Sequence, residues 1–387
     1  MATTRVKVTI LAVGQGMGNL IEVYEGTKMT QLILVDCGGN SEREIHVKDC
    51  IWKIHAAMQK RAKALGKTNL YRHIDLLVLS HQDRDHHSIL HEILKRQNKK
   101  FISIGEFWGF DENYCTLSAD YEQCRDKIVE IAGNQCILPD GSAYENGALA
   151  WHLYASDYAC LTYLYTNARG GDSRNTVSAV IQLELRFPGK FVYRFLFPGD
   201  PTKQTMEQIS SVKLPGDYEI DYMSAPHHGS IVTCDSSSLT AFLEKMKVRE
   251  VVVSAGEGNG YGHPHKTFME IAENKIHCTV DPHSCYYNTT DKGENGHYGI
   301  KSTAKRLYTS FVPDPTARGR AVRGEYYHYV YTMSSSGMKE SLEGIERHSG
   351  SPYTLTEHPA QENSRSWRAV AMPGMARHGL PDMAERR

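Results

Sequence analysis

The sequence lacks the features of a membrane-spanning or secreted protein. Its 387 residues contain no apolar run near the roughly 18 residues that a membrane span needs, and the start of the chain has no apolar signal segment. The nine cysteines are scattered, and no two of them form a CxxC pair. This pattern predicts reduced thiols. We therefore expect a cytoplasmic protein with no membrane contact.

An excess of charge of either sign is also missing. The chain has 44 Lys and Arg residues against 45 Asp and Glu residues, so its formal net charge is −1. Such a molecule does not attract nucleic acid through its overall field, and any polynucleotide would need a locally basic surface. Two segments are locally basic, and they contain Lys60, Arg61, Lys63 and Lys67, and Lys95, Arg96, Lys99 and Lys100. The alternative is that each segment is the solvated face of a helix.

Patterns typical of strands and of helices alternate along most of the chain. Strands are expected at residues 6–13, 20–24, 31–35, 74–80, 101–104, 147–155, 177–185, 191–197, 218–224 and 250–254. Helices are expected at residues 44–64, 121–131, 202–210, 237–246 and 267–274. Because polar clusters follow several of the strands, this order predicts a layered α/β domain with its site at one edge of the sheets.

The pattern weakens from Pro313 onward. One further strand is expected at residues 325–332. Residues 334–387 are rich in Ser, Gly, Glu, Arg and Pro and have few apolar runs, which predicts a mobile tail. We therefore expect one domain over residues 1–312 and a partly disordered extension over residues 313–387.

One segment combines metal-binding side chains at high density. The letters LSHQDRDHHS place three histidines and two aspartates directly after the apolar strand at 74–80, at His81, Asp83, Asp85, His86 and His87. Imidazole and carboxylate groups are the ligands of hydrolytic metal centres, and a turn at a strand end can aim several of them at one point. The alternative, a polar surface turn, needs only one or two Asp or Asn residues.

Three later clusters also follow apolar strands. Asp200 comes after Gly199, which lets the backbone turn sharply. The segment MSAPHHGS supplies His227 and His228, and the Gly-rich segment GEGNGYGHPH supplies His263 and His265. Each segment alone is typical of an ordinary loop, but four such clusters in one chain favour a shared site.

The order and spacing of these motifs resemble the metallo-β-lactamase superfamily, and specifically the soluble hydrolase domain of the DNA-uptake channel protein ComEC. VGQGMGNLIEV followed by LILVDCGGN is similar to the first hairpin and Asp-x-Gly turn of that family, and LSHQDRDHH is similar to its metal motif. The loops at 226–230 and 262–264 match as well, and the resemblance covers residues 5–305. It implies an αββα sandwich, with a hydrolase domain at 1–312 and a C-terminal extension at 313–387.

The resemblance also implies the metal ligands. His81 and Asp83 would hold one ion, Asp85 and His86 would hold a second, and Asp200 would bridge the two. One or two divalent ions are expected, with Mn²⁺ or Zn²⁺ as the first candidates and Mg²⁺ as a further one.

Further roles follow from the same likeness. His263 would complete the second ion's ligands or stand over the leaving group, and Asp85 would share in catalysis. His227 would be either a ligand or a hydrogen-bond donor to a developing oxyanion. Asp36 and His228 would orient ligand side chains from behind. The locally basic segment after the metal motif, and not the resemblance, suggests that Lys95, Arg96, Lys99 and Lys100 would guide the substrate.

Two positions depart from the superfamily pattern. Asp83 stands where most members have a histidine, and its harder oxygen shifts the expected preference from zinc toward manganese or magnesium. The usual third histidine of the first ion has only one candidate, His152, which lies within a strand pattern and fits a structural role better. The first ion would therefore bind weakly.

These observations predict a metal-dependent hydrolase that uses a metal-activated water. A phosphodiesterase or nuclease acting on nucleic acid is the first interpretation, since the charge of a phosphodiester gains most from paired cations. One alternative is a small-molecule hydrolase of an ester, amide or cyclic nucleotide. Another is a non-enzymatic module that binds a protein partner through residues 313–387.

Overall fold

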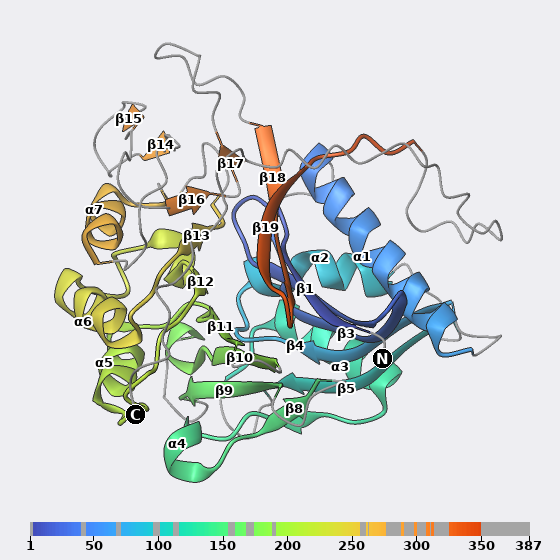
Figure 1. Cartoon of the computed structure of the whole chain (residues 1–387), viewed down its shortest axis with the longest axis horizontal. Coiled ribbons are helices and arrows are strands. Elements are labelled where there is room, and N and C mark those ends of the chain that lie inside the picture. The colour runs from blue at the N-terminus through green and yellow to red at the C-terminus, as the bar shows by residue number, and fades with distance from the viewer. Residues whose placement is uncertain are drawn as a thin grey trace.

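The computed structural model has two β-sheets that face each other between two groups of helices (Figure 1). It describes residues 3–39, 44–66, 71–95, 101–110, 116–153, 159–167, 174–187, 191–255, 261, 263–275, 288–289, 298–299, 307–309, 311–312 and 325–349. Helices α1, α2 and α3 pack on the first sheet, and α5, α6 and α7 lie on the side of the second sheet. The expected α/β class, with an αββα order of layers, is confirmed.

The first sheet has the order β17-β18-β1-β2-β3-β4-β5-β6, with β19 beside β18. Its strands are β1 (Thr4–Ile10), β2 (Gly18–Glu25), β3 (Lys28–Cys37), β4 (Arg72–Val78), β5 (Ile102–Gly109), β6 (Cys136–Ile137), β17 (Phe311–Val312), β18 (Glu325–Ser334) and β19 (Gly337–Gly344). The first three strands form the expected antiparallel meander, and β3 to β6 run parallel.

The second sheet has the order β16-β13-β12-β11-β10-β9-β7, with β8 beside β9. Its strands are β7 (Gly141–Ser142), β8 (Ala150–His152), β9 (Cys160–Thr166), β10 (Val180–Phe187), β11 (Phe191–Phe197), β12 (Tyr222–Ser224), β13 (Val251–Val253) and β16 (Leu307–Thr309). Strands β11, β12, β13 and β16 are parallel, so their carboxyl ends lie at one edge. A separate short pair is β14 (Asn288–Thr289) with β15 (Tyr298–Gly299).

The helices differ in length and place. They are α1 (Ile45–Ala64), α2 (Arg84–Lys95), α3 (Ala119–Ala132), α4 (Ala143–Asn146), α5 (Lys203–Ser211), α6 (Ser236–Met246) and α7 (Lys266–Lys275), with 3₁₀ turns η1 (Arg174–Val177) and η2 (Pro226–Gly229). The expected helices at 44–64, 121–131, 202–210, 237–246 and 267–274 correspond to α1, α3, α5, α6 and α7. None of the helices in the described ranges has the length and apolar character that crossing a membrane requires.

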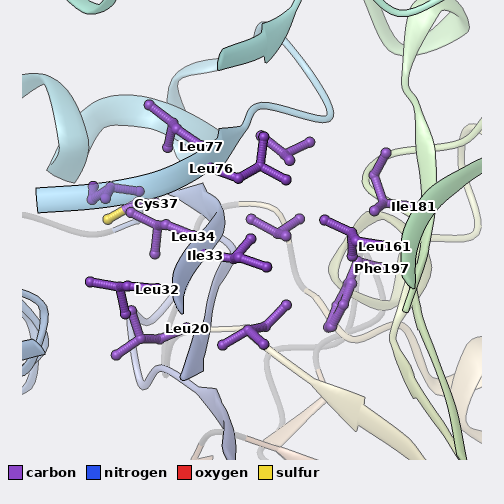
Figure 2. Close-up of a cluster of buried hydrophobic side chains, with 14 of the residues drawn as sticks. Leu20, Leu32, Ile33, Leu34, Cys37, Leu76, Leu77, Leu161, Ile181 and Phe197 are labelled. Carbon is purple, nitrogen blue, oxygen red and sulfur yellow. The ribbon is translucent and has the colours of Figure 1, made fainter. Parts of the chain in front are cut away.

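The main core lies between the two sheets. Ile33 and Leu76 are neighbours in the β3–β4 register, so their side chains share one face of the first sheet. Figure 2 shows them facing Leu161 and Phe197 of the second sheet. All four are fully buried, and each such side chain contributes about 1.5–3 kcal/mol by leaving water. This core fixes the two sheets, and so the loops at their edge, relative to each other.

The C-terminal hairpin is part of the first sheet. Strand β18 pairs antiparallel with β1 and buries Val330 and Met333, and β19 pairs with β18. The expected strand at 325–332 is confirmed, but the expectation of a tail from residue 334 was wrong for residues 337–344. Strand β19 is an edge strand with charged residues, which periodicity does not detect. Residues 350–387 lie outside the described residues, and the division at residue 312 stays a prediction.

A buried carboxylate fastens this hairpin to α1. His328 Nδ1 accepts a hydrogen bond from the backbone N–H of Ala12 at 3.1 Å, so Nε2 carries the ring proton and donates to Asp49 Oδ2 at 2.9 Å. His348 Nε2 lies 2.6 Å from the other oxygen of Asp49, and the N–H of Glu346 donates to the same carboxylate. The chain segment after β19 is therefore held by Asp49.

One expected basic side chain is not on the surface. Arg61 is buried, and its guanidinium donates to both oxygens of Asp75 at 2.7 and 2.8 Å. Lys60 Nζ lies 4.7 Å from the centre of the Tyr24 ring. The reading of residues 60–67 as a basic surface was therefore wrong at Arg61, because its position on α1 faces the sheet. Lys67 lies outside the described residues.

Candidate metal centre

The polar clusters expected from the sequence meet at one edge of the sandwich. Asp36 is the second-last residue of β3, and His81 lies in the loop between β4 and α2. From the other sheet, Asp200 follows β11, and the η2 turn that carries His228 follows β12. Because these parallel strands end at the same edge, loops far apart in the sequence converge there.

Three buried side chains form the first group. One ligand atom each from His81, His86 and Asp200 lie within 4.8 Å of one another. The shortest of these contacts joins His86 Nε2 and Asp200 Oδ1, at 3.1 Å. All three side chains are almost fully buried. Two imidazoles and one carboxylate are a suitable set for a divalent transition metal.

A second group shares His86 with the first. Ligand atoms of Asp85, His86 and His228 also lie within 4.8 Å of one another. His228 Nε2 is 3.1 Å from Asp85 Oδ2 and 3.7 Å from Asp200 Oδ1. The two groups are therefore contiguous, with His86 and Asp200 between His81 on one side and His228 on the other.

The unsatisfied atoms of this cluster test whether a cation fits. Nε2 of His81, His86 and His228 and Oδ1 of Asp200 are buried and make no hydrogen bond of acceptable geometry, although His86 and Asp200 lie in ion-pair contact. A buried polar atom without a partner costs about 1–3 kcal/mol. These atoms belong to two contiguous donor groups, and each group fits a divalent cation, which would accept electron pairs from its members. The donor set thus fits a metal ion on the chemistry of its own atoms.

Hydrogen bonds behind the cluster fix the ligand rings. Asp36 Oδ1 accepts from the N–H of Ser80 at 2.8 Å, and Asp36 Oδ2 accepts from the Ser80 hydroxyl at 2.5 Å and lies 3.1 Å from His86 Nδ1. His228 Nδ1 donates to the carbonyl of Ser254 at 3.0 Å. Each ring therefore turns Nε2 toward the carboxylates, as is usual for metal-ligating histidines. Asp36 therefore contacts His86 from the side opposite to Asp200, and its orienting role stays a prediction.

Charges within the cluster shift its pKa values in opposite directions. Burial opposes a charged ring, but the carboxylates of Asp200 and Asp36 raise the pKa of His86 well above its usual value. Burial likewise opposes a charged carboxylate, yet the neighbouring histidines hold the pKa of Asp200 well below its usual range. Burial lowers the pKa of His81, and the charge of His86 adds to this effect. The carboxylate at the centre is therefore ionised, as a metal ligand must be.

The backbone at the site is shaped for close approach. Gly199 has φ of +61°, and a Cβ there would lie 2.4 Å from Ser178 Oγ. A Cβ on Gly38 would lie 2.3 Å from the backbone of Asp85. His227 and His228 have φ of 46° and 55°, a left-handed conformation that costs a non-glycine residue about 1–3 kcal/mol. Such strain is concentrated at functional sites, and here it aims two histidines inward.

Three expected residues stand at the border of the cluster. Asp83 Oδ1 is 3.4 Å from Arg174 and its Oδ2 is 3.9 Å from His81 Nε2, so it belongs to neither group. His227 Nε2 is 3.3 Å from Asp200 Oδ2, and its Nδ1 is 2.6 Å from the Thr233 hydroxyl. His263 is also in neither group, and its ring stacks against His228.

The sequence interpretation gave His228 an orienting role and His263 a ligand role. In the structure His228, and not His263, lies in a donor group with Asp85 and His86. The signal in the sequence was the doubled histidine, and in the structure both rings approach Asp200. His152 is exposed on β8. Lys95 ends α2, but its side chain and Arg96, Lys99 and Lys100 lie outside the described part of the chain.

Comparison with known proteins gives one sequence relative. No family model matches the chain. ComE operon protein 3 of Bacillus subtilis is 22% identical over 206 residues, which cover 52% of this chain and 22% of that protein. The chain therefore spans less than a quarter of the length of this curated relative. The match agrees with the resemblance drawn from the motifs.

Solved structures of the metallo-β-lactamase fold are among those similar to the chain. The metallo-β-lactamase fold protein YhfI from Bacillus subtilis has a TM-score of 0.40 and 14% identity, over 70% of this chain and 94% of that one. A long-form RNase Z from yeast has a TM-score of 0.37 and 11% identity, over 68% of this chain and 39% of that one. The diiron β-hydroxylase CmlA from Streptomyces venezuelae has a TM-score of 0.36 and 13% identity, over 73% of this chain and 48% of that one.

Proposed function

We propose that the chain is a metal-dependent hydrolase with its centre at His81, Asp85, His86, Asp200 and His228. The observation that carries this proposal is the set of four buried atoms without hydrogen bonds that lie in two contiguous donor groups at one edge of the sandwich. A structural polar cluster would satisfy its atoms by hydrogen bonds, because unsatisfied ones destabilise the fold. A site that is complete only with a cation has the opposite pattern.

A divalent ion held there would act as a Lewis acid and lower the pKa of water to about 7. The side chains around it have separate tasks. Asp85 and Asp200 supply the negative charge that holds the ion, and Asp36 keeps His86 aligned. His227, partly exposed and oriented by Thr233, is placed to donate a hydrogen bond to an oxygen that becomes negative during the reaction.

The substrate we propose is a phosphodiester of nucleic acid. Two contiguous donor groups suit one or two cations, and a phosphodiester carries its negative charge next to the reacting atom. The match to a ComE protein supports the same class. We expect higher activity with manganese than with zinc, since the centre includes two carboxylates and Asp83 adds a third at its border. A cytoplasmic location and a protein partner for residues 313–387 stay predictions.

The test uses the full-length protein, stripped with a chelator and reloaded with manganese, zinc or magnesium. Substrates are a single-stranded oligonucleotide, a cyclic nucleotide, an aryl ester and a lactam. We expect metal-dependent cleavage of the oligonucleotide that is lost in Asp200→Asn and kept in the surface control Asp126→Asn. Turnover of the ester or lactam alone would assign a small-molecule hydrolase instead. Failure of the protein to bind any of these metals would contradict the proposal as a whole.

A further inference from the structure

Three rings form a ladder from the surface to the metal centre. Tyr261 and His263 have centroids 5.7 Å apart and planes inclined by 20°, and His263 and His228 follow at 6.2 Å and 19°. Tyr261 is 64% exposed, His263 is buried and His228 is fully buried beside Asp85. The outermost ring therefore presents its surface to solvent two ring spacings from a proposed metal ligand.

The middle ring of the ladder is held firmly. The side-chain amide of Gln15 donates to His263 Nδ1 at 3.2 Å. The rings of His227 and His265 meet His263 edge-on, at 5.5 and 5.0 Å. His263 is therefore a fixed support for Tyr261. A fixed aromatic face loses little entropy when a flat group stacks on it.

The loop that carries His227 is tied to the same support. The N–H of His265 donates to the carbonyl of Gly229, and the N–H of Ile231 donates to His265 Nδ1 at 2.9 Å. The next residue in this loop, Val232, is 71% exposed. Two apolar groups therefore face solvent on joined loops at the rim of the centre.

The other side of the centre carries a positive charge. The guanidinium of Arg174 lies 3.4 Å from Asp83, next to His81, and its side chain is 57% exposed. The rim therefore combines an aromatic face on the His228 side with a guanidinium on the His81 side. A nucleotide has the complementary parts, a flat base and an anionic phosphate.

We propose that Tyr261, supported by His263, is a stacking platform for a nucleobase beside the phosphodiester at the metal centre. This rests on the proposed function and narrows its substrate to single-stranded nucleic acid, because bases in a duplex are covered by their neighbours. Every base has a flat face, so the platform accepts all four bases. His263 then acts as a positioning residue and not as a metal ligand.

The test measures binding of a short thymidine oligonucleotide and of the same chain made of abasic nucleotides. Dissociation constants are obtained by fluorescence anisotropy on the full-length protein in chelator, where no turnover occurs. We expect Tyr261→Ala to raise the Kd for the thymidine chain about five- to tenfold and the Kd for the abasic chain less than twofold. Tyr261→Phe keeps the ring and should bind like the parent protein.

The matched control is Tyr71→Ala. Tyr71 is also exposed, but it lies immediately before the start of β4, whereas His81 follows the far end of that strand. Tyr71→Ala should leave the dissociation constants of both oligonucleotides unchanged. An equal effect of Tyr261→Ala on the two oligonucleotides, or no effect on either, would overturn the platform. Base-dependent binding through Tyr261 without cleavage in any metal would instead support the platform and contradict the proposed hydrolase.

Discussion

Asp36 Oδ2 lies 3.1 Å from Nδ1 of His86, whose other ring nitrogen lies 3.1 Å from Asp200. Asp36 lies near the end of β3, and His86 lies in the first turn of α2. Both residues are fully buried. A carboxylate in this position fixes the tautomer and the orientation of the ring and makes its free nitrogen a better electron donor. We therefore expect Asp36 to strengthen metal binding without direct contact to the ion.

Asp36→Asn should therefore weaken metal binding about 10- to 100-fold. The substitution preserves the shape of the side chain but removes the charge that holds His86. Isothermal titration of the stripped protein with manganese measures the change, with Asp126→Asn as the surface control. Unchanged affinity in Asp36→Asn would show that the contact with His86 serves the fold alone.

The two candidate ligand histidines can be separated by metal content. His228→Ala removes an unsatisfied nitrogen from the cluster, so we expect it to lose at least one equivalent of bound metal. His263→Ala should retain the metal, because His263 lies in neither donor group. Elemental analysis after dialysis distinguishes them. Loss of metal in His263→Ala with retention in His228→Ala would reverse our assignment.

Asp49 should contribute strongly to stability. Asp49→Ala leaves the N–H of His328 buried without its acceptor and releases the segment around His348, so we expect a loss of about 1–3 kcal/mol in the free energy of unfolding. Urea denaturation measures the loss. Asp126→Ala, whose carboxylate is mostly exposed and pairs with Arg125, should cost less than about 1 kcal/mol. Equal effects of the two substitutions would show that Asp49 does not hold the C-terminal hairpin on α1.

Two buried histidines of α1 should make the metal-free protein sensitive to acid. Burial, aided by Arg72, lowers the pKa of His55 to about 3, and burial, aided by His328, lowers that of His46 to about 4. A lowered folded pKa gives stability that is present above the ordinary value of about 6.5 and is lost as pH falls toward the folded value.

Between these limits each histidine contributes a slope of about 1.4 kcal/mol per pH unit. His55→Leu replaces the imidazole with an apolar side chain that does not titrate. It should reduce the slope of the unfolding free energy against pH by about this amount. Urea denaturation in chelator at a series of pH values gives both slopes. An identical slope in the parent protein and in His55→Leu would show that His55 does not titrate between the two states.

The sequence predicted the elements that have strong local patterns. The predicted bounds of helix α1 and strand β4 lie within a few residues of the observed ones. A long amphipathic pattern is typical of a helix, and a short continuous apolar run is typical of a buried strand. The region of β19 was read as part of a tail because an edge strand with Lys339, Glu340 and Glu343 does not show the apolar alternation of a buried strand. Its stability comes from pairing with β18, a contact that local patterns do not reveal.

The site was predictable to the level of its loops but not of its geometry. The clusters at His81, Asp200 and His228 were expected to meet because polar groups at ends of parallel strands share one edge. Whether His228 or His263 lies in a donor group depends on the left-handed backbone at residues 227 and 228. This conformation is uncommon for histidine, and the sequence pattern does not predict it. Similarly, the exposure of Tyr261 results from tertiary packing.

Metal binding and oligonucleotide cleavage, measured together on the parent protein and on Asp200→Asn, show whether this cluster is a catalytic metal centre. Asp200 contacts both donor groups, so the account predicts that Asp200→Asn remains folded, binds metal at least tenfold more weakly and loses cleavage at manganese concentrations that saturate the parent protein. A folded Asp200→Asn protein with the metal content and cleavage rate of its parent would contradict it.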